Sequence, residues 1–413
     1  FLISSVLKWT KSALRRAPSP PLRFPSAGFE IVPASEPLEE EDLEQFSASA
    51  YYPVDIGDVV EKLGFGSTST VWLAKNLQFV FDFVSDCVSA LLNKNNSREH
   101  LHVALKIHIQ GHTGKEEFEV SNKTLQGDSA HPGYHHLRTA REMIVLPHPN
   151  GDHHCMVQNP MWDSWIEFSA GTLHVASIYR CSKGAFSRFY AFSIIYTMNI
   201  KADDILHRIA DKSILDTFVQ EELTAPSARK TVKGVTLYKS RQFHLPKHLG
   251  IVVMSDLGAA VRGDLKRNHD AQPDVYRSPE VILEVPWSYP IDIWNVGVMI
   301  RDIFEGELLF HGVDSTDSAY STRAHLAEVI GMLGMPPLDL IKRGSRSDEF
   351  STDDGQWKAD VPIPAHSSLG ESEENLEGDE KQDFLRFMGG MLQWRPEDRK
   401  TAKELLQDPW LYS

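Results

Sequence analysis

The chain has 413 residues, 41% of them hydrophobic and 24% charged, which suits one large domain or two closely packed lobes. Its net charge of −15 argues against general DNA or RNA binding, which needs a basic surface. The negative charge suits a basic protein partner, and solubility alone is the alternative explanation. The three cysteines are odd in number and show no metal-ligand spacing, so neither a disulfide framework nor a zinc site is expected. No apolar run reaches the roughly 18–20 residues that span a bilayer, so a membrane span is not expected.

Residues 1–50 are predicted to form a disordered N-terminal tail. Five prolines between positions 18 and 33 interrupt any long element, and the acidic run 39–44 follows them. Few of these residues could be buried in a core. The first 29 residues contain five basic residues and no acidic one, which is typical of a transit peptide and equally of a basic tail.

From Tyr51 onward, short runs of β-forming residues predict a small β-rich lobe over about 51–158. Residues 63–71 have the sequence Leu-Gly-Phe-Gly-Ser-Thr-Ser-Thr-Val, with two glycines two positions apart. Glycines let the backbone approach phosphate oxygens closely, with N–H groups facing the anion. An ordinary hairpin turn is the alternative.

Lys106 lies within a predicted buried strand at 103–107. A lysine on such a strand is costly unless it is paired, and a phosphate together with a carboxylate would pair it. Glu142, in a helix predicted over 135–146, is the candidate carboxylate. The alternative is that the lysine extends its amine to solvent.

Beyond about residue 160, helices are expected to dominate, with apolar periodicity at 290–310, 322–335 and 383–393. A β-rich lobe followed by a larger helical lobe is an α+β, two-lobe arrangement, with the hinge at about 156–160 and the second lobe at about 161–411. The cleft between two such lobes is the expected ligand site. Residues 340–380 are polar and acidic and are predicted to form a surface excursion.

Several short motifs follow in the second half of the chain. Residues 254–258, Met-Ser-Asp-Leu-Gly, place Asp256 at a strand end, where its carboxylate could bind Mg²⁺ or simply form a turn. Tyr-Arg-Ser-Pro-Glu at 276–280, Asp-Ile-Trp-Asn-Val-Gly at 292–297 and Arg-Pro-Glu-Asp-Arg at 395–399 come next. Each motif is weak alone, whereas their shared order and spacing carry weight.

In this order the motifs resemble those of the eukaryotic protein kinases, over residues 51–411. Residues 52–58, 64–73, 276–283 and 288–297 are similar to the SR-protein kinase branch as it occurs in fungi. The segment 325–331, with the prolines at 336 and 337, resembles an insert of the larger group that contains this branch.

The resemblance implies a bilobal serine/threonine kinase that uses ATP and Mg²⁺ to phosphorylate basic, Arg/Ser-rich proteins. Lys106 would contact the α- and β-phosphates and pair with Glu142, and Asp256 would bind Mg²⁺. Glu280 would pair with Arg399 in a buried ion pair. Asp292 would brace the catalytic loop, and residues 156–159 would contact the adenine. The implied nucleotide-binding residues are Gly64, Phe65, Gly66, Ser67, Ser69, Val71, Ala104, Lys106 and Glu142.

The catalytic loop departs from the pattern. The resemblance predicts His-Thr-Asp-Ile-Lys-Ala-Asp-Asn, and residues 197–204 are Thr-Met-Asn-Ile-Lys-Ala-Asp-Asp. Lys201 is in place, Asn199 stands where the catalytic aspartate is expected, and Asp204 stands where a metal-binding asparagine is expected. Asp204 keeps oxygen ligands for Mg²⁺. Asn199 cannot accept a proton, and loss of a general base costs about 10²–10⁴-fold in rate.

These residues are compatible with a weak kinase and with an ATP-binding pseudokinase. A gene product that folds poorly is the third hypothesis. An apolar insert at 77–95, and the loss of clean helical periodicity at 165–195, favour a faulty gene model as an alternative explanation. Residues 257–277 contain no serine or threonine and only Tyr276 as a hydroxyl acceptor, so activation by serine or threonine phosphorylation is not expected there. We expect a monomer in the cytoplasm, the nucleus or both, without nucleic-acid or membrane partners.

Overall fold

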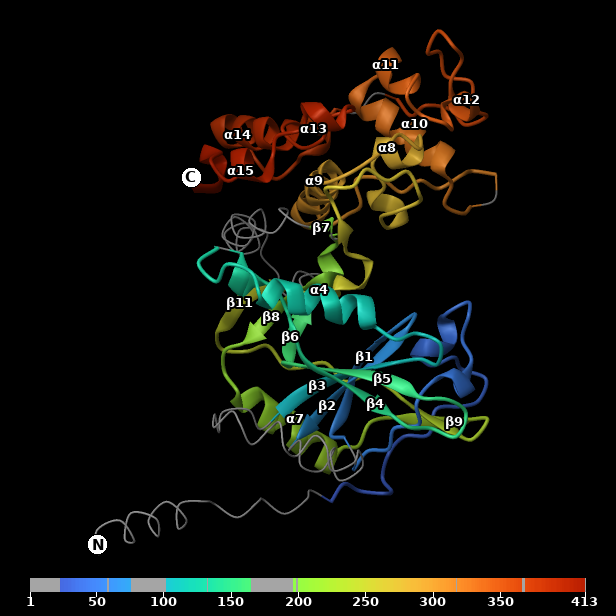
Figure 1. The fold of residues 1–413 in the computed structure, drawn as a ribbon, viewed down its shortest axis with the longest axis vertical. Coiled ribbons are helices and arrows are strands. Elements are labelled where there is room, and N and C mark those ends of the chain that lie inside the picture. The colour runs from blue at the N-terminus through green and yellow to red at the C-terminus, as the bar shows by residue number, and fades with distance from the viewer. Residues whose placement is uncertain are drawn as a thin grey trace, which may run out of the picture. The chain divides into compact units, whose positions relative to one another are not determined.

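The structure is a computed structural model that describes residues 23–57, 59–75, 102–131, 133–164, 196–197, 200–316, 318–365 and 368–412. The predicted insert at 77–95, the segment 165–195 and Asn199 lie outside the described residues. The chain divides into two compact units (Figure 1). The first comprises Phe1–Gln110, Val145–His153 and Ser213–Arg241, and the second comprises Gly111–Ile144, His154–Lys212 and Gln242–Ser413.

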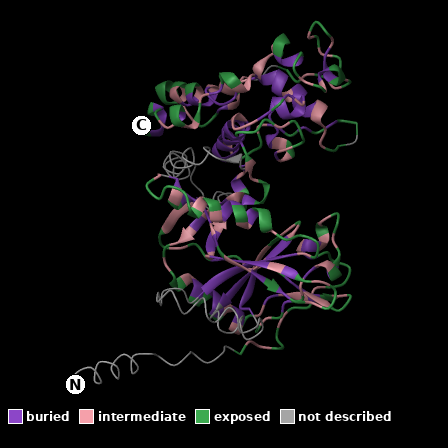
Figure 2. Cartoon of the chain, viewed as in Figure 1, coloured by how far each residue is buried: buried purple, intermediate pink, exposed green. Residues whose placement is uncertain are grey.

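Three antiparallel strands carry the glycine motif and Lys106. β1 (Glu61–Gly66) pairs with β2 (Ser69–Lys75), which pairs with β3 (His102–His108). The register of β1 shifts between Lys62 and Gly64, as in a β-bulge. All seven residues of β3 are buried, as the apolar sequence predicts (Figure 2). The strand order of the sheet is β1-β2-β3-β5-β4.

The helix predicted over 135–146 is wrong. A single 3-10 turn, η3 (Tyr134–His136), precedes strand β4 (Ala140–Leu146), and β5 (His153–Gln158) follows. Ile144 and Leu146 are buried whereas Val145 between them is 43% exposed, so the burial alternates with the period of a strand. The absence of helix breakers in this stretch was therefore a weaker signal than its β-branched residues.

Residues 31–50 make defined backbone and ionic contacts with the rest of the first unit, where the sequence predicts a disordered tail. Ile31 forms a parallel bridge with Arg229, and the N–H of Val32 donates to the carbonyl of Arg229 at 3.1 Å. The acidic run forms η1 (Glu39–Asp42), in which Glu40 is buried. Lysines from other segments form ion pairs with this acidic run. The composition of residues 1–50 alone does not indicate these ion pairs.

The segment 213–241 belongs to the first unit and was not anticipated as a structured element. Helix α7 (Ser213–Thr224) buries Leu215, Phe218 and Val219 on one face. Strands β9 (Arg229–Val232) and β10 (Val235–Tyr238) form a hairpin whose two turn residues both have positive φ, as a type I′ turn requires. The ring of Tyr238 packs edge-on against Trp72 of β2, at 5.7 Å between centroids.

In the second unit, short strands continue as far as residue 262, whereas the sequence predicts mainly helices beyond 160. β6 (Met161–Ser164), β8 (Ile205–Ile209) and β11 (Leu249–Met254) form an antiparallel sheet in the order β11-β8-β6. β7 (Tyr196–Thr197) pairs with β12 (Val261–Arg262). Helix α4 (Lys115–Leu125) also belongs to this unit.

The predicted helices near 290, 322 and 383 are confirmed. They are α9 (Pro290–Glu305), α10 (Thr322–Leu333) and α14 (Gly378–Gly389). Helix α9 is buried all round and forms the centre of the core of this unit, as its nearly continuous apolar sequence requires (Figure 2). The shorter helices are α8 (Pro279–Ile282), α11 (Leu338–Ile341), α12 (Ser347–Phe350), α13 (Leu369–Ser372) and α15 (Ala402–Leu405).

Residues 340–380 are mostly exposed, with a few anchors such as Leu340 and Phe350 buried in the core. Of the helices described, none is both long and apolar enough to cross a membrane.

Candidate functional site

The glycine motif forms the end of the β1–β2 hairpin. Gly66 pairs with Ser69 across the turn, and Phe65 is 42% exposed. A Cβ atom built on Gly64 or Gly66 would meet no other atom within 4 Å. The backbone of this loop therefore borders open space, which is what a loop that covers phosphate groups needs.

Val71, Ala104 and Lys106 lie on one face of the sheet. Val71 is the direct partner of Lys106, and Leu73 is the direct partner of Ala104. Direct antiparallel partners share a face, as do residues two apart on one strand. Ala104 is fully buried and Lys106 is 9% exposed. Three predicted nucleotide-binding residues from two strands are thus brought together.

Glu142 lies on strand β4 and not on a helix. Burial raises the pKa of its carboxyl group. The helix that follows the Lys106 strand is α4, whose buried glutamate is Glu117. The sequence signal for this helix was present in residues 115–125, a run of helix-forming residues flanked by glycines at 114 and 127. Glu117 is therefore the buried glutamate of the helix that follows the Lys106 strand.

Asp256 follows the end of β11 in a strained backbone conformation. Its φ of 53° and ψ of 75° are left-handed, and its Oδ1 accepts a hydrogen bond from the N–H of Gly258 at 3.3 Å. Non-glycine residues seldom adopt this conformation, and those that do cluster at functional sites. The conformation fixes the direction of the Asp256 carboxylate.

The second candidate metal ligand lies beside the first. The N–H of Ser255 donates to the carbonyl of Asp204 at 2.6 Å, which joins the segments that carry Asp204 and Asp256. Lys201 Nζ lies 3.9 Å from Asp204 Oδ1. No group of three or more His, Cys, Asp or Glu suited to a metal occurs in the described part of the chain. Two carboxylates fit Mg²⁺, which usually completes its coordination with phosphate oxygens and water.

Asn295 of helix α9 braces the catalytic loop. Its side chain is fully buried and its Nδ2 donates to the carbonyl of Ile200 at 3.2 Å, next to the position of Asn199. Asp292, to which the resemblance assigned this role, is 1% exposed one turn earlier on the same helix. Asn295 belongs to the motif at 292–297, but the sequence predicts no role for it.

Arg138 is a buried cation that sequence reasoning missed. Its Nε and Nη2 donate to the carbonyl of Asn159 at 3.2 and 3.0 Å, and its Nη1 donates to Ser255 Oγ at 3.3 Å. Burial lowers the pKa of Arg138 to about 10, and the carboxylates of Glu117 and Asp256 oppose that change. Arg138 thus ties the predicted hinge to the residue before Asp256. Its only sequence signal was an arginine directly after an apolar residue, Leu137.

Tyr276 is buried against helix α9. Burial, followed by the nearby carboxyl group of Asp302, raises the pKa of its hydroxyl group. Burial in turn raises the pKa of Asp302 to about 7. Arg277 forms ion pairs with Asp270 and Asp274 at 3.1 and 2.9 Å, which hold the preceding segment. The only tyrosine of residues 257–277 is therefore inaccessible to a modifying enzyme.

Glu280 and Arg399 form the predicted buried ion pair. Two parallel contacts of 2.6 and 2.7 Å join the guanidinium and the carboxylate, and both side chains are fully buried. The guanidinium also lies over the ring of Trp294, at 5.1 Å from its centroid. This pair fastens α8 to the end of the chain.

Comparisons with known proteins identify the family of this chain. A model of the protein kinase domain matches residues 245–411. A serine/threonine protein kinase of Aspergillus fumigatus is 36% identical over 415 residues, covering 96% of each chain. The serine/threonine-protein kinase SRPK of Physarum polycephalum is 27% identical and covers 90% of this chain and 91% of its own. A crystal structure of a kinase domain matches with a TM-score of 0.60 at 18% identity, covering 86% of this chain and 94% of that domain.

Proposed function

Because this chain belongs to the serine/threonine protein kinases, we propose that it transfers the γ-phosphate of ATP to serine or threonine in basic, Arg/Ser-rich proteins. It has the α+β, bilobal fold of a protein kinase. The observation that carries the proposal is the backbone hydrogen bond from Ser255 to Asp204, because it joins the segment of Lys201 and Asp204 to the segment of Asp256.

Each of the candidate site residues has a distinct proposed task. The loop at Gly64 and Gly66 covers the phosphates with backbone N–H groups, and Lys106 binds phosphate oxygens. Asp204 and Asp256 hold Mg²⁺, which when bound neutralises charge on the phosphates. Lys201 adds a positive charge beside Asp204. Phosphoryl transfer depends mainly on such positioning and charge, so these residues can support a slow reaction.

Asn199 sets the limit on the rate. An amide can orient the hydroxyl group of a substrate by hydrogen bonding, but it cannot accept the proton as a carboxylate does. This residue therefore favours a second candidate function, an ATP-binding pseudokinase that binds the same partners without phosphorylating them.

Charge supports a basic substrate. The chain carries 57 acidic and 42 basic residues. A surface of this sign attracts Arg-rich segments and raises their association rate. The name of the Physarum polycephalum relative, SRPK, agrees with this substrate class.

The test is phosphate transfer from labelled ATP to an Arg-Ser repeat peptide. We expect slow incorporation into serine by the native chain and none by Lys106→Met. A matched peptide with glutamate in place of arginine should be a poorer substrate, and added salt should lower incorporation into the Arg-Ser peptide because it screens the attraction. Binding of ATP and of the Arg-Ser peptide without incorporation would establish the pseudokinase instead, and equal use of the two peptides would rule out the proposed substrate class.

A further inference from the structure

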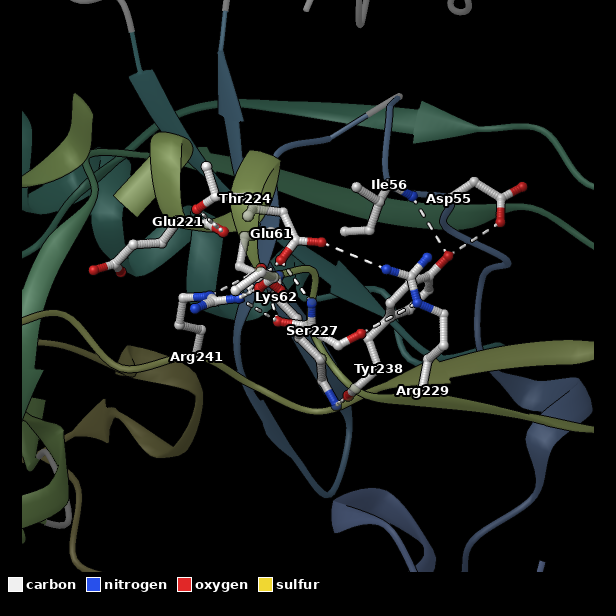
Figure 3. Close-up of polar contacts among 12 residues, drawn as sticks. Asp55, Ile56, Glu61, Lys62, Glu221, Thr224, Ser227, Arg229, Tyr238 and Arg241 are labelled. Carbon is white, nitrogen blue, oxygen red and sulfur yellow. Dashed lines mark hydrogen bonds and ion pairs between the residues drawn. The ribbon is translucent and has the colours of Figure 1, made fainter. Parts of the chain in front are cut away.

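A buried cluster of charged groups lies at the start of β1, outside the group that binds phosphate (Figure 3). Glu61 of β1 and Glu222 of α7 are both fully buried. They come from parts of the sequence more than 150 residues apart. Two carboxylates without access to water are costly unless cations, hydrogen bonds or a proton compensate them.

Arg241 connects the two carboxylates. Its Nε lies 3.3 Å from Glu61 Oε2, and its Nη2 lies 3.1 Å from Glu222 Oε2 and 2.6 Å from the carbonyl of Ala225. Ser227 donates its hydroxyl to Glu61 Oε2 at 2.9 Å and its N–H to Glu222 Oε2 at 2.8 Å. Each of these contacts either joins β1 to the segment 213–241 or joins two residues within that segment.

The next residue of β1 is held in the same way. The fully buried amine of Lys62 contacts Glu39 at 2.6 Å, Glu40 at 2.5 Å and the carbonyl of Tyr238 at 2.9 Å. The N–H of Arg241 donates to the carbonyl of Lys62 at 3.1 Å. The first two residues of β1 are therefore fixed by segments that lie far from them in the sequence.

The glycine-rich loop begins directly after these residues. Gly64 follows Glu61 by three positions. The bulge between Lys62 and Gly64 separates Glu61 and Lys62, which make the contacts above, from the loop that begins at Gly64. A Cβ atom built on Gly64 or Gly66 would meet no other atom within 4 Å. Its position therefore depends on the anchored start of the strand.

We propose that Glu61, Glu222 and Arg241 are positioning residues through which the segment 213–241 sets the placement of the glycine-rich loop, and hence the affinity for ATP. This inference rests on the proposed function, since it assigns the loop to ATP. In the sequence, the segment lies between Asp204 and Asp256.

The cluster also makes the loop sensitive to pH. Burial, and then the neighbouring carboxyl group of Glu222, raise the pKa of Glu61 to about 8. Around Glu61 and Glu222 lie Arg241 and Arg229, and beside them the pair of Lys62 with Glu39 and Glu40. Because the folded-state pKa of Glu61 is raised from 4.5, its stabilising contribution is complete below about pH 4.5 and is lost as the pH rises through 8.

Two variants test the inference, with a third as the control. Arg241→Gln removes the link between the carboxylates, and Glu61→Gln mimics the protonated carboxyl group at every pH. Glu221→Gln is the control, because the side chain of Glu221 points away from the cluster (Figure 3). The readouts are the Kd for ATP with Mg²⁺ at pH 7 and pH 9, and amide hydrogen exchange of residues 61–66 at both pH values.

We expect Arg241→Gln to raise the Kd on the order of tenfold at pH 7 and to speed exchange in residues 61–66. The native chain and Glu221→Gln should bind ATP more weakly at pH 9 than at pH 7, whereas Glu61→Gln should bind equally at both. An unchanged Kd and unchanged exchange in Arg241→Gln, or the same pH response in Glu61→Gln as in the native chain, would overturn the inference. Absence of ATP binding by the native chain would contradict the proposed function, and the exchange data would still decide whether the cluster positions β1.

Discussion

Replacing Asn199 by aspartate is expected to raise the rate of phosphate transfer by about 10²–10⁴-fold. The substitution restores a carboxylate at the position from which the resemblance expects the substrate hydroxyl group to be deprotonated. Asn295 already fixes the adjacent carbonyl of Ile200, so the restored side chain enters a braced loop. The measurement is the initial rate on an Arg-Ser peptide at saturating ATP.

The control for this gain is Asn199→Ala, which also removes the amide but supplies no carboxylate and should not exceed the native rate. The Kd for ATP should be similar in all three proteins, because residue 199 acts on the substrate hydroxyl and not on the nucleotide. Equal rates for the native chain and Asn199→Asp would show that the asparagine is not what limits transfer.

Breaking the buried ion pair is expected to have the largest effect on stability. Arg399→Met leaves the fully buried carboxylate of Glu280 without its partner, which typically costs about 3–5 kcal/mol. The free energy of unfolding, from urea titration at equal m-value, measures the loss. Glu280→Gln with Arg399→Met should lose less than the sum of the two single variants, because no unpaired charge remains.

An exposed pair provides the matched control. Arg395 and Asp339 contact each other at 2.9 Å but are 35% and 55% exposed. Asp339→Asn should therefore cost about 1 kcal/mol or less. A similar small loss in Arg399→Met would contradict the view that Glu280–Arg399 fastens the second unit.

The sequence predicted the parts of the fold whose signals are local. The all-buried strand around Lys106, the glycine hairpin and the long helix α9 each follow from residue pattern within one element. The helix predicted at 135–146 failed because the β-branched residues of β4 and its place in the sheet beside β5 outweigh the absence of helix breakers. The assignment of Glu142 to a helix followed from that error.

Other features depend on contacts between distant segments. The acidic residues 39–41 are held by Lys62 and Lys230, the latter nearly two hundred positions away, so composition alone indicated disorder. Arg138 acquires its importance only when Asn159 and Ser255 meet at its guanidinium. Ion pairs of this kind have no sequence period, and single arginines or glutamates are usually exposed.

The central claim, that this kinase keeps a working nucleotide site despite Asn199, is tested most directly by thermal stabilisation with ATP and Mg²⁺. At about 100 times the Kd, a ligand that binds only the folded state stabilises it by about 2.7 kcal/mol. We expect the melting temperature of the native chain to rise and that of Lys106→Met to stay unchanged. No rise in the native chain, or an equal rise in both proteins, would contradict the account.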